Sequence, residues 1–421
     1  MALTQEYQHF SMKILIAGGG IGGLTAALSL HEAGFEVEIY ESVPELKPLG
    51  VGINLLPHCV RVLTDLGLQT TLGEIAVETS DLSYYNRQGQ CYWSEPRGRA
   101  AGYKWPQFSI HRGGLQMVLF NAVQSRLGKG AIKTGRHLER FSQDSKGVTA
   151  YFSENAGGAI VEAVHGNLLV GADGIGSALR SQLYPDEGAP VYSENVLYRG
   201  TALMPPFLNG RTMVMIGSLR QKMVVYPISS PDSDGKILTN WVANLKEGAS
   251  ALTVRDWNRP ANKARLEKLY ANWNFDWLNV PKMIHLARTV YEFPMSDRNP
   301  LEKWSFGRVT LLGDAAHPMY PIGSNGASQA ILDCESLTLN LIKYGVNPEA
   351  LSAYEAERLP ATSRVVFQNR AKGPDEIMDL MEDRFPNGFS EVEIPHNELA
   401  AIMNNYKKIA GFDKESLNAS K

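Results

Sequence analysis

The N-terminal part of the chain contains a glycine-rich turn between two short apolar segments. Residues 13–17 read KILIA, the turn AGGGIGG follows, and a segment with helical spacing leads to EVEIYE at residues 36–41. Within the turn, Gly18, Gly20 and Gly23 satisfy the spacing GxGxxG. This order of strand, turn, helix and strand predicts a βαβ unit and therefore a parallel sheet.

The three glycines have separate tasks in a nucleotide-binding turn. The first permits the tight turn, the second lets a pyrophosphate approach the backbone, and the third lets the helix pack closely on the strand. Glu41 ends the second strand, where its carboxylate can accept hydrogen bonds from the hydroxyls of an adenosine ribose. The unit therefore predicts a dinucleotide site, with the pyrophosphate at the helix N-terminus. The motif by itself leaves NAD, NADP and FAD open.

Composition and charge narrow the class of protein. The chain has 421 residues, enough for two or three domains, and its 44% hydrophobic and 20% charged content is typical of a globular protein. A formal net charge of -3, without a long run of lysine and arginine, argues against a nucleic-acid partner. Cys59, Cys91 and Cys334 lack metal-ligand spacing, so we expect neither a disulfide framework nor a metal site.

The N-terminal residues resemble no targeting signal. MALTQEYQHFSMK lacks the basic stretch and apolar run of a signal peptide, and no segment approaches the ~18 consecutive apolar residues of a membrane span. We therefore expect a cytoplasmic protein without a membrane partner. Met12 is a candidate native start, and residues 1–11 are expected to be dispensable to the fold.

The local patterns change along the chain and predict an α/β protein with a second, β-rich unit. Alternating strand-like segments replace the βαβ pattern near residue 80, apolar strands and helices return, and a further block of strands follows. We expect a discontinuous nucleotide-binding domain formed by residues 12–80, 109–185 and 293–385, the last piece rich in helices. The inserted β-rich domain comprises residues 81–108 and 186–292, and residues 386–421 have no assigned role.

Two further motifs repeat the strand-to-turn pattern. They are LLVGADGIGSALR, which contains Asp173 and Gly174, and VTLLGDAAHPM, which contains Gly313 and Asp314. With these three motifs in this order, the chain resembles the single-component FAD-dependent aromatic hydroxylases related to para-hydroxybenzoate and salicylate hydroxylase. The segments PLGVGINLLP, YKWPQFSIHRGGLQMVL and LLGDAAHPMYPIGSNGASQAILD are most similar to the members that hydroxylate phenazine carboxylates.

The resemblance implies both a fold and a reaction. The fold is a Rossmann-type (GR2-like) FAD-binding domain with an inserted β-rich substrate domain and C-terminal helices. The reaction uses NAD(P)H and O2 to hydroxylate an aromatic or heteroaromatic substrate, with or without loss of a carboxylate, through a flavin hydroperoxide. The expected partners are therefore small molecules, and the expected assembly is a monomer or a homodimer.

The resemblance also implies the residues that surround the cofactor. Asp314 would face the ribityl chain of FAD, Arg112 would reach its phosphates, and Pro321 would lie beside the reactive edge of the flavin. The helix that begins near Ala327 would direct its amides at negative charge on the reduced flavin. The complete set of implied cofactor-binding residues is Gly18, Gly20, Ile21, Gly22, Gly23, Glu41, Val51, Arg112, Leu138, Asp173, Gly174, Asp314, Pro321, Gly323, Gly326 and Ala327.

Catalysis and substrate binding have fewer candidates. Pro321 and Gly326 are the catalytic candidates, together with His317, for which we favour a structural role. Arg199 lies in an apolar strand, where a guanidinium can bind a substrate carboxylate bidentately. The other candidates for a planar substrate's pocket are Tyr198, Tyr226, Trp241 and His285. The sequence identifies no base that would ionise a phenol.

Two alternatives keep the same fold. One is a flavin-binding protein without turnover, and the other is a different flavin oxidoreductase, namely a reductase, an oxidase or a halogenase. The segment WNFDWLNV at residues 273–280 has two tryptophans but lacks the glycine and proline of the halogenase motif GWxWxIP. An NAD-dependent dehydrogenase would leave the second and third motifs without a purpose.

Overall fold

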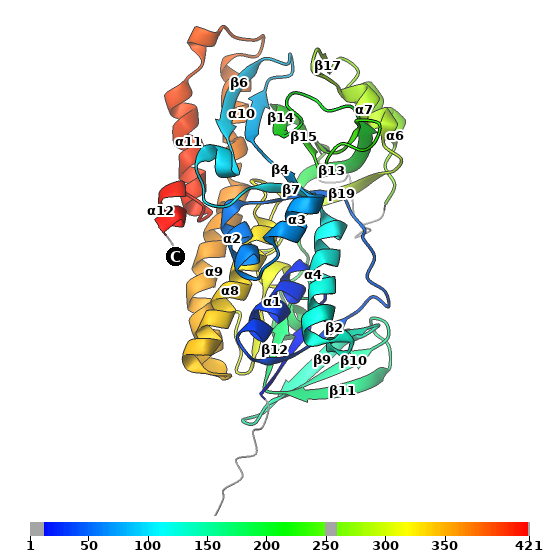
Figure 1. The fold of residues 1–421 in the computed structure, drawn as a ribbon, viewed down its shortest axis with the longest axis vertical. Coiled ribbons are helices and arrows are strands. Elements are labelled where there is room, and N and C mark those ends of the chain that lie inside the picture. Colours follow the sequence, from blue (N-terminus) through cyan, green and yellow to red (C-terminus); the bar gives the residue numbers. More distant parts are fainter. Residues whose placement is uncertain (1–11, 249–258, 420–421) are drawn as a thin grey trace, which may run out of the picture.

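The computed structural model describes residues 12–248 and 259–419. Residues 1–11, which we expect to be dispensable to the fold, lie outside the described residues. The sequence also predicts a polar helix-like segment around residues 254–274, and part of it lies outside the described residues. In the described ranges a parallel sheet with helices occupies one part of the molecule and a larger sheet another (Figure 1). No helix in these ranges is both long and apolar enough to cross a membrane.

The expected βαβ unit is present at the centre of the parallel sheet. Strand β1 is almost fully buried, which is why its sequence reads as a continuous apolar run, and helix α1 (Ile21–Glu32) connects it to β2. Parallel pairing gives the order β20 (Val309–Leu311), β12 (Leu168–Gly171), β1 (Lys13–Ala17), β2 (Glu36–Glu41) and β8 (Ile132–Thr134). Because β1, β12 and β20 are neighbours and parallel, the three motif turns meet at one edge of the sheet.

Smaller antiparallel sheets and helices surround this core. The sheet β11-β10-β9 packs beside the parallel strands at the lower end of Figure 1. Its strands are β9 (His137–Gln143), β10 (Val148–Ser153) and β11 (Ile160–Gly166). The second small sheet contains β3 (Gly52–Leu55), β4 (Val77–Glu78) and β7 (Phe108–His111). The helices nearby are α2 (Pro57–Asp65), α3 (Gln69–Ile75), α4 (Arg112–Leu127) and α5 (Ala178–Leu183).

The strand-rich segments form a seven-stranded sheet. Its order is β19-β13-β16-β15-β14-β5-β6, antiparallel except where β14 pairs with β5. The strands are β5 (Asp81–Tyr85), β6 (Cys91–Pro96), β13 (Val191–Met204), β14 (Thr212–Ser218), β15 (Gln221–Pro227), β16 (Ile237–Lys246) and β19 (Val290–Asp297). Residues distant in sequence, from 81 to 297, therefore share one sheet.

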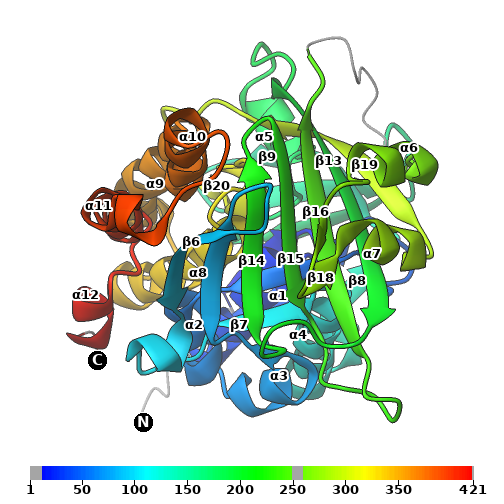
Figure 2. The ribbon, with the colours of Figure 1, turned by 90° about the horizontal axis from the view of Figure 1, so that it is seen from above.

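The two faces of this sheet have different neighbours. One face packs on α6 (Lys263–Leu269) and α7 (Val280–Leu286), through a core that contains Trp241 and Met283 (Figure 2). The short strands β17 (Asn274–Phe275) and β18 (Leu278–Asn279) join these helices. At the β14 and β5 end, the opposite face packs on the C-terminal helices through Met213, Met215 and Met378. The remainder of that face is free to line a cavity.

The C-terminal helices include two that lie in the segment 386–421, to which the sequence assigned no role. The C-terminal helices are α8 (Gly326–Tyr344), α9 (Pro348–Arg370), α10 (Glu376–Arg384), α11 (His396–Ile409) and α12 (Lys414–Ala419). Helix α11 lies in the segment 386–421 and buries Leu399, Met403 and Tyr406. Its apolar positions follow helical spacing, so α11 docks on α9 and on the adjoining loop.

The contact between strand β1 and helix α1 leaves no room at one glycine. A Cβ atom at Gly23 would lie 1.9 Å from the carbonyl oxygen of Gly18, whereas one at Gly20 would meet nothing within 4 Å. We expect Gly23→Ala to lower the free energy of unfolding by about 2 kcal/mol, because helix and strand must separate. Gly20→Ala is the matched control and should change it by less than about 1 kcal/mol. Urea unfolding measures both, and equal effects would contradict this account.

Candidate functional site

Two adjoining cavities lie where the three motif turns meet. The one that we call the central cavity has a volume of about 350 Å³ and reaches the face of the seven-stranded sheet. The outer cavity has a volume of about 390 Å³ and reaches Glu41 at the end of β2. Both are lined by Gly20, Arg112 and Gly174, so they form one continuous site.

Most of the expected cofactor-binding residues line one or both of the two cavities. The central cavity is lined by Gly20, Ile21, Gly22, Arg112, Gly174, Asp314, Pro321, Gly326 and Ala327. The outer cavity is lined by Gly18, Gly20, Glu41, Arg112, Leu138, Asp173 and Gly174. Three expected residues line neither cavity. They are Gly23, which packs on Gly18, Val51, whose carbonyl accepts a hydrogen bond from the Arg112 amide at 2.9 Å, and Gly323.

The carboxylate of Glu41 holds the glycine turn in place. Its Oε2 accepts a hydrogen bond from the amide of Gly19 at 2.6 Å, and its Oε1 accepts one from the amide of Val43 at 2.8 Å. Gly18 has a φ of 108°, a conformation that favours glycine. A carboxylate offers about four lone-pair positions, so Glu41 retains capacity to accept a hydroxyl from a molecule in the outer cavity.

Two acidic side chains of the second and third motifs lie deep in the molecule. Burial raises the pKa of Asp173, whose Oδ2 accepts from the Leu179 amide at 3.2 Å. Its Oδ1 has no hydrogen-bond partner among the described residues. The side chain of Asp314 is exposed to the central cavity but is enclosed by protein on the remaining sides, and this desolvation raises its pKa. Both carboxyl groups are therefore available to hydroxyl or phosphate-bearing ligands.

The N-terminus of α8 supplies amides to the central cavity. The helix has 19 residues and begins at Gly326, and Gly326 and Ala327 both line the cavity. The amides of a helix's first turn have no partners within the helix, and the helix dipole adds positive potential there. This end of the central cavity therefore favours negative charge.

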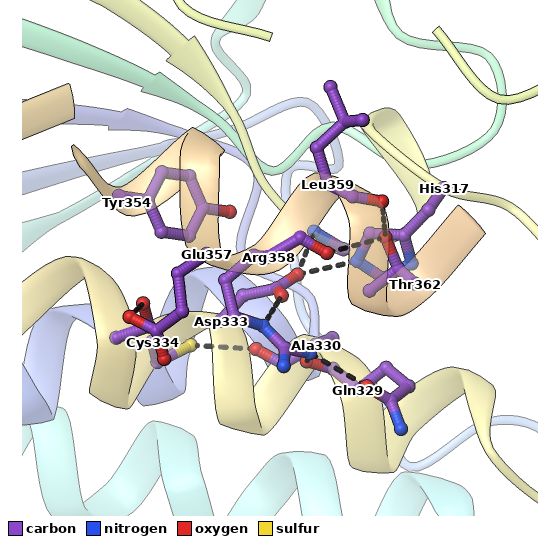
Figure 3. Close-up of polar contacts among 12 residues, drawn as sticks. His317, Gln329, Ala330, Asp333, Cys334, Tyr354, Glu357, Arg358, Leu359 and Thr362 are labelled. Atoms are coloured by element: carbon purple, nitrogen blue, oxygen red, sulfur yellow. Dashed lines mark hydrogen bonds and ion pairs between the residues drawn. The ribbon is translucent and has the colours of Figure 1, made fainter. Parts of the chain in front are cut away.

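His317 does not line either cavity. It is 3% exposed, and its Nε2 lies 2.5 Å from Asp333 Oδ2 (Figure 3). The same carboxylate accepts from Arg358 Nε at 2.8 Å and from the amide of Gly313 at 3.1 Å. His317 therefore ties the turn after β20 to helices α8 and α9, which corrects its place among the catalytic candidates and agrees with the structural role that we favoured.

Strand alternation separates the substrate candidates into two groups. Arg199 and Tyr226 line the central cavity. Tyr198 points to the other face, where its hydroxyl lies 2.8 Å from Glu247, and Trp241 is fully buried in the core against α6 and α7. His285 is 72% exposed on α7. Tyr198 and Trp241 do not line the central cavity, because neighbours along a strand face opposite sides, and His285 does not line it because it lies exposed on α7.

The sequence did not point to two residues, Gly52 and Asn240, that shape the wall of the central cavity. Asn240 Oδ1 accepts from the amide of Gly52 at 2.7 Å, and Arg199 Nη2 donates to the Gly52 carbonyl at 3.0 Å. A Cβ at Gly52 would lie 2.7 Å from both Asn240 and Tyr226. The alternation Asn240, Val242, Asn244 around Trp241 was the available signal, since those three share one face.

The guanidinium of Arg199 lacks a carboxylate partner among the described residues. Burial lowers its pKa, and the neighbouring positive charge of Arg112 lowers it further. Its Nε atom has no hydrogen-bond partner in the same ranges of the chain. A half-buried cation that lines a cavity and has no carboxylate partner in the described chain is an attractive site for an anionic group.

The Asp333 cluster makes stability depend on pH. Burial raises the pKa of Asp333, but His317 and Arg358 outweigh burial and lower it to about 2, from an ordinary value of 3.8. A carboxyl group whose pKa is lower in the folded than in the unfolded protein stabilises the fold at pH values above its unfolded pKa. This stabilisation is lost as the pH falls toward its folded pKa. As the pH falls from 4 to 2, we expect the difference in free energy of unfolding between wild type and Asp333→Asn to decrease by about 2 kcal/mol.

Urea unfolding of both proteins from pH 5 to pH 2 measures this loss. Asp234→Asn is the control, because that side chain is 68% exposed. A difference between wild type and Asp333→Asn that stays constant over this range would contradict the expectation.

Comparisons with known proteins identify the family to which the chain belongs. The FAD binding domain family matches residues 11–369. Phenazine 1,6-dicarboxylic acid hydroxylase of Lysobacter antibioticus is 41% identical over 367 residues, which cover 86% of this chain and 90% of that protein. 3-Hydroxybenzoate 6-hydroxylase of Polaromonas naphthalenivorans is 29% identical over 90% of this chain and 94% of its own.

Solved structures show the same fold. HpxO of Klebsiella pneumoniae, complexed with FAD and uric acid, superposes with a TM-score of 0.76 at 22% identity, covering 98% of both chains. The family match and the relatives confirm the expected cofactor and enzyme class, and the solved structure confirms the expected fold class. The chain belongs to the FAD binding domain family and is an FAD-dependent aromatic-ring monooxygenase that works with NAD(P)H and O2.

Proposed function

We propose that this enzyme hydroxylates a planar aromatic or heteroaromatic carboxylate, such as a phenazine carboxylate, with or without loss of the carboxyl group. The observation that carries the proposal is the wall of the central cavity, where the unpaired guanidinium of Arg199 lies beside Tyr226 and the apolar side chains of Val224 and Val242. A flat apolar surface with one cation at its edge suits a planar anion. The 41% identical relative is named for a phenazine dicarboxylic acid.

The residues of the two cavities fit FAD. Gly20 lines both cavities with open space beside it, which leaves the close approach that a pyrophosphate needs, Asp173 keeps an unpartnered oxygen among the described residues, and α8 directs free amides inward. We assign the adenosine half to the outer cavity at Glu41 and Leu138, and the flavin half to the central cavity. When bound, FAD accepts hydride from NAD(P)H and delivers one oxygen atom of O2 to the aromatic ring.

The chain's own residues orient and protect this chemistry. Gly326 and Ala327 would stabilise negative charge with their amides, and Pro321 would present its backbone to the reacting edge. Asp314 would accept from hydroxyls of the cofactor. Arg199 would hold the substrate's carboxylate. We assign no acid or base role to His317, because its ring is already paired with Asp333.

The loop from Pro321 to Gly326 is held by the C-terminal helix α11. The hydroxyl of Tyr406 accepts from Asn325 Nδ2 at 2.9 Å and lies 2.9 Å from Asn369 Oδ1 and 3.2 Å from the carbonyl of Ile322. A Cβ at Gly323 would meet this hydroxyl at 2.0 Å. Gly323, which we expected to approach the flavin, is thus needed by Tyr406, and the loop's position depends on the tail.

We propose that the segments that bind FAD and the segments that bind the substrate correspond to the two large sheets. Residues 12–80, 109–185 and 293–385 would bind FAD, and residues 81–108 and 186–292 would bind the substrate. Residues 386–421 would support the loop through α11. We further propose a cytoplasmic enzyme that works as a monomer or a homodimer.

The first test is turnover with a panel of ring acids. Purified protein should be yellow with FAD, and NADH or NADPH consumption should be measured with phenazine carboxylates, hydroxybenzoates, salicylate and quinolones. Mass spectrometry should show a gain of one oxygen, with or without loss of carbon dioxide. Arg199→Gln should raise the KM of the carboxylate substrate about tenfold, whereas Tyr198→Phe, on the other face of β13, should not. Oxidation that yields only hydrogen peroxide with every compound would refute the proposal.

The second test concerns the loop. Tyr406→Phe keeps the ring but leaves Asn325 and Asn369 without their hydroxyl partner, so we expect a looser loop, about tenfold weaker FAD binding and more hydrogen peroxide per NAD(P)H. Tyr103→Phe is the control, since Tyr103 donates to the Phe412 carbonyl of the same tail at 2.7 Å without touching the loop. FAD affinity follows from the quenching of flavin fluorescence. Equal FAD affinity in the two variants would show that the loop does not depend on Tyr406.

A further inference from the structure

A small polar chamber adjoins the central cavity on the far side of Pro321. We call it the distal chamber. Its volume is about 60 Å³, and it shares Met213, Lys222, Val224, Pro321 and Ser324 with the central cavity, so the two spaces are contiguous. Its polar lining consists of Tyr84, Arg97, Gln107, Lys222, Tyr406 and Lys407.

A single row of side chains leads from Arg199 to this chamber. Across the seven-stranded sheet, Arg199 pairs with Val242, Val242 with Val224, Val224 with Met215, and Met215 with Tyr84. Four strand spacings of about 4.8 Å place the two ends of the row about 19 Å apart. The apolar middle of the row is a floor with a cation at one end and a phenol at the other.

The distal chamber is lined by positive charges whose partners lie outside it. Lys222 pairs with Asp375, and both Arg97 and Lys407 pair with Glu95 at 2.8 Å. The three cations line the chamber, whereas the two carboxylates do not. Three positive charges against two negative charges leave an excess of one positive charge around the chamber.

Two buried polar atoms of the lining have no partner. Tyr84 Oη and Gln107 Oε1 make no hydrogen bond within the described part of the chain. Tyr84 is fully buried and Gln107 is 2% exposed. Leaving a buried donor unpaired is unfavourable, so the Tyr84 hydroxyl is suited to donate to an acceptor that enters the chamber, whereas Gln107 Oε1 is itself an acceptor and gives an anion no hydrogen bond.

We propose that the distal chamber binds an anionic substituent, a carboxylate, on the end of the planar substrate that lies away from Arg199. The proposal rests on the proposed function and specifies its substrate class, namely a multi-ring aromatic acid long enough to span the row from Arg199 to Tyr84. Tyr84 donates a hydrogen bond to the carboxylate, and Lys222, Arg97 and Lys407 offset its charge. An apolar substituent would leave Tyr84 unpaired and the positive charge uncompensated.

The test compares two ligands on FAD-loaded protein. Phenazine-1,6-dicarboxylate carries a carboxylate for each end of the row, whereas phenazine-1-carboxylate has the same rings and only the carboxylate that Arg199 would hold, and their dissociation constants follow from quenching of flavin fluorescence and from calorimetry. Tyr84→Phe and Lys407→Gln should each weaken binding of the dicarboxylate about tenfold and change that of the monocarboxylate by less than about twofold. Tyr84→Phe should fold normally, because the hydroxyl it removes has no partner among the described residues.

Tyr92→Phe is the matched control. Tyr92 lies near Tyr84, with ring centroids 6.2 Å apart and the rings tilted, and its buried hydroxyl also lacks a partner in the described ranges, but it does not line the chamber. Dicarboxylate affinity that is the same in wild type, Tyr84→Phe and Lys407→Gln would overturn the proposal, and would do so even if Arg199→Gln weakens binding and turnover persists. Wild-type protein that binds FAD but hydroxylates none of the ring acids would instead refute the proposed function.

Discussion

The carboxylate of Asp333 connects the elements on which the site depends. It lies in α8 and binds the amide of Gly313 after β20, the ring of His317 and the guanidinium of Arg358 in α9. These bonds fix the turn that carries Asp314 relative to the helix whose N-terminus lines the central cavity. A fully buried carboxylate is tolerated because two cationic or polar side chains and an amide satisfy it. The cavity's shape is thus set by a cluster that does not touch its contents.

The seven-stranded sheet uses its two faces for different purposes. Trp241 and Tyr198 belong to the face that packs on α6 and α7, whereas Arg199 and Tyr226 belong to the face that lines the cavity. One rigid element therefore supplies both the packing and the recognition surface, which is how a site retains its geometry. Some polar atoms on the cavity side have no hydrogen-bond partner within the described chain. Their burial is unfavourable unless a bound ligand supplies the missing hydrogen bonds.

The C-terminal tail completes the other wall. Tyr406 reaches the loop from Pro321 to Gly326, and Lys407, the next residue, reaches Glu95 on β6. Helix α11 thus links the loop from Pro321 to Gly326 to the edge of the seven-stranded sheet. Such a link explains why a segment without a motif of its own is packed against the site.

The sequence by itself determined the βαβ unit and the three motif turns, because glycine spacing and strand periodicity are local properties, whereas the choice of FAD came from the family resemblance that those motifs carry. It also identified Arg199, although not which of its neighbours share its face. Tertiary structure decided that Tyr198 and Trp241 turn away and that Asn240, Lys222 and Tyr84 turn toward the cavities. It also gave Gly323 its partner in Tyr406, 83 positions later in the chain. These outcomes depend on sheet register and helix docking, which join residues far apart in sequence and leave no local pattern.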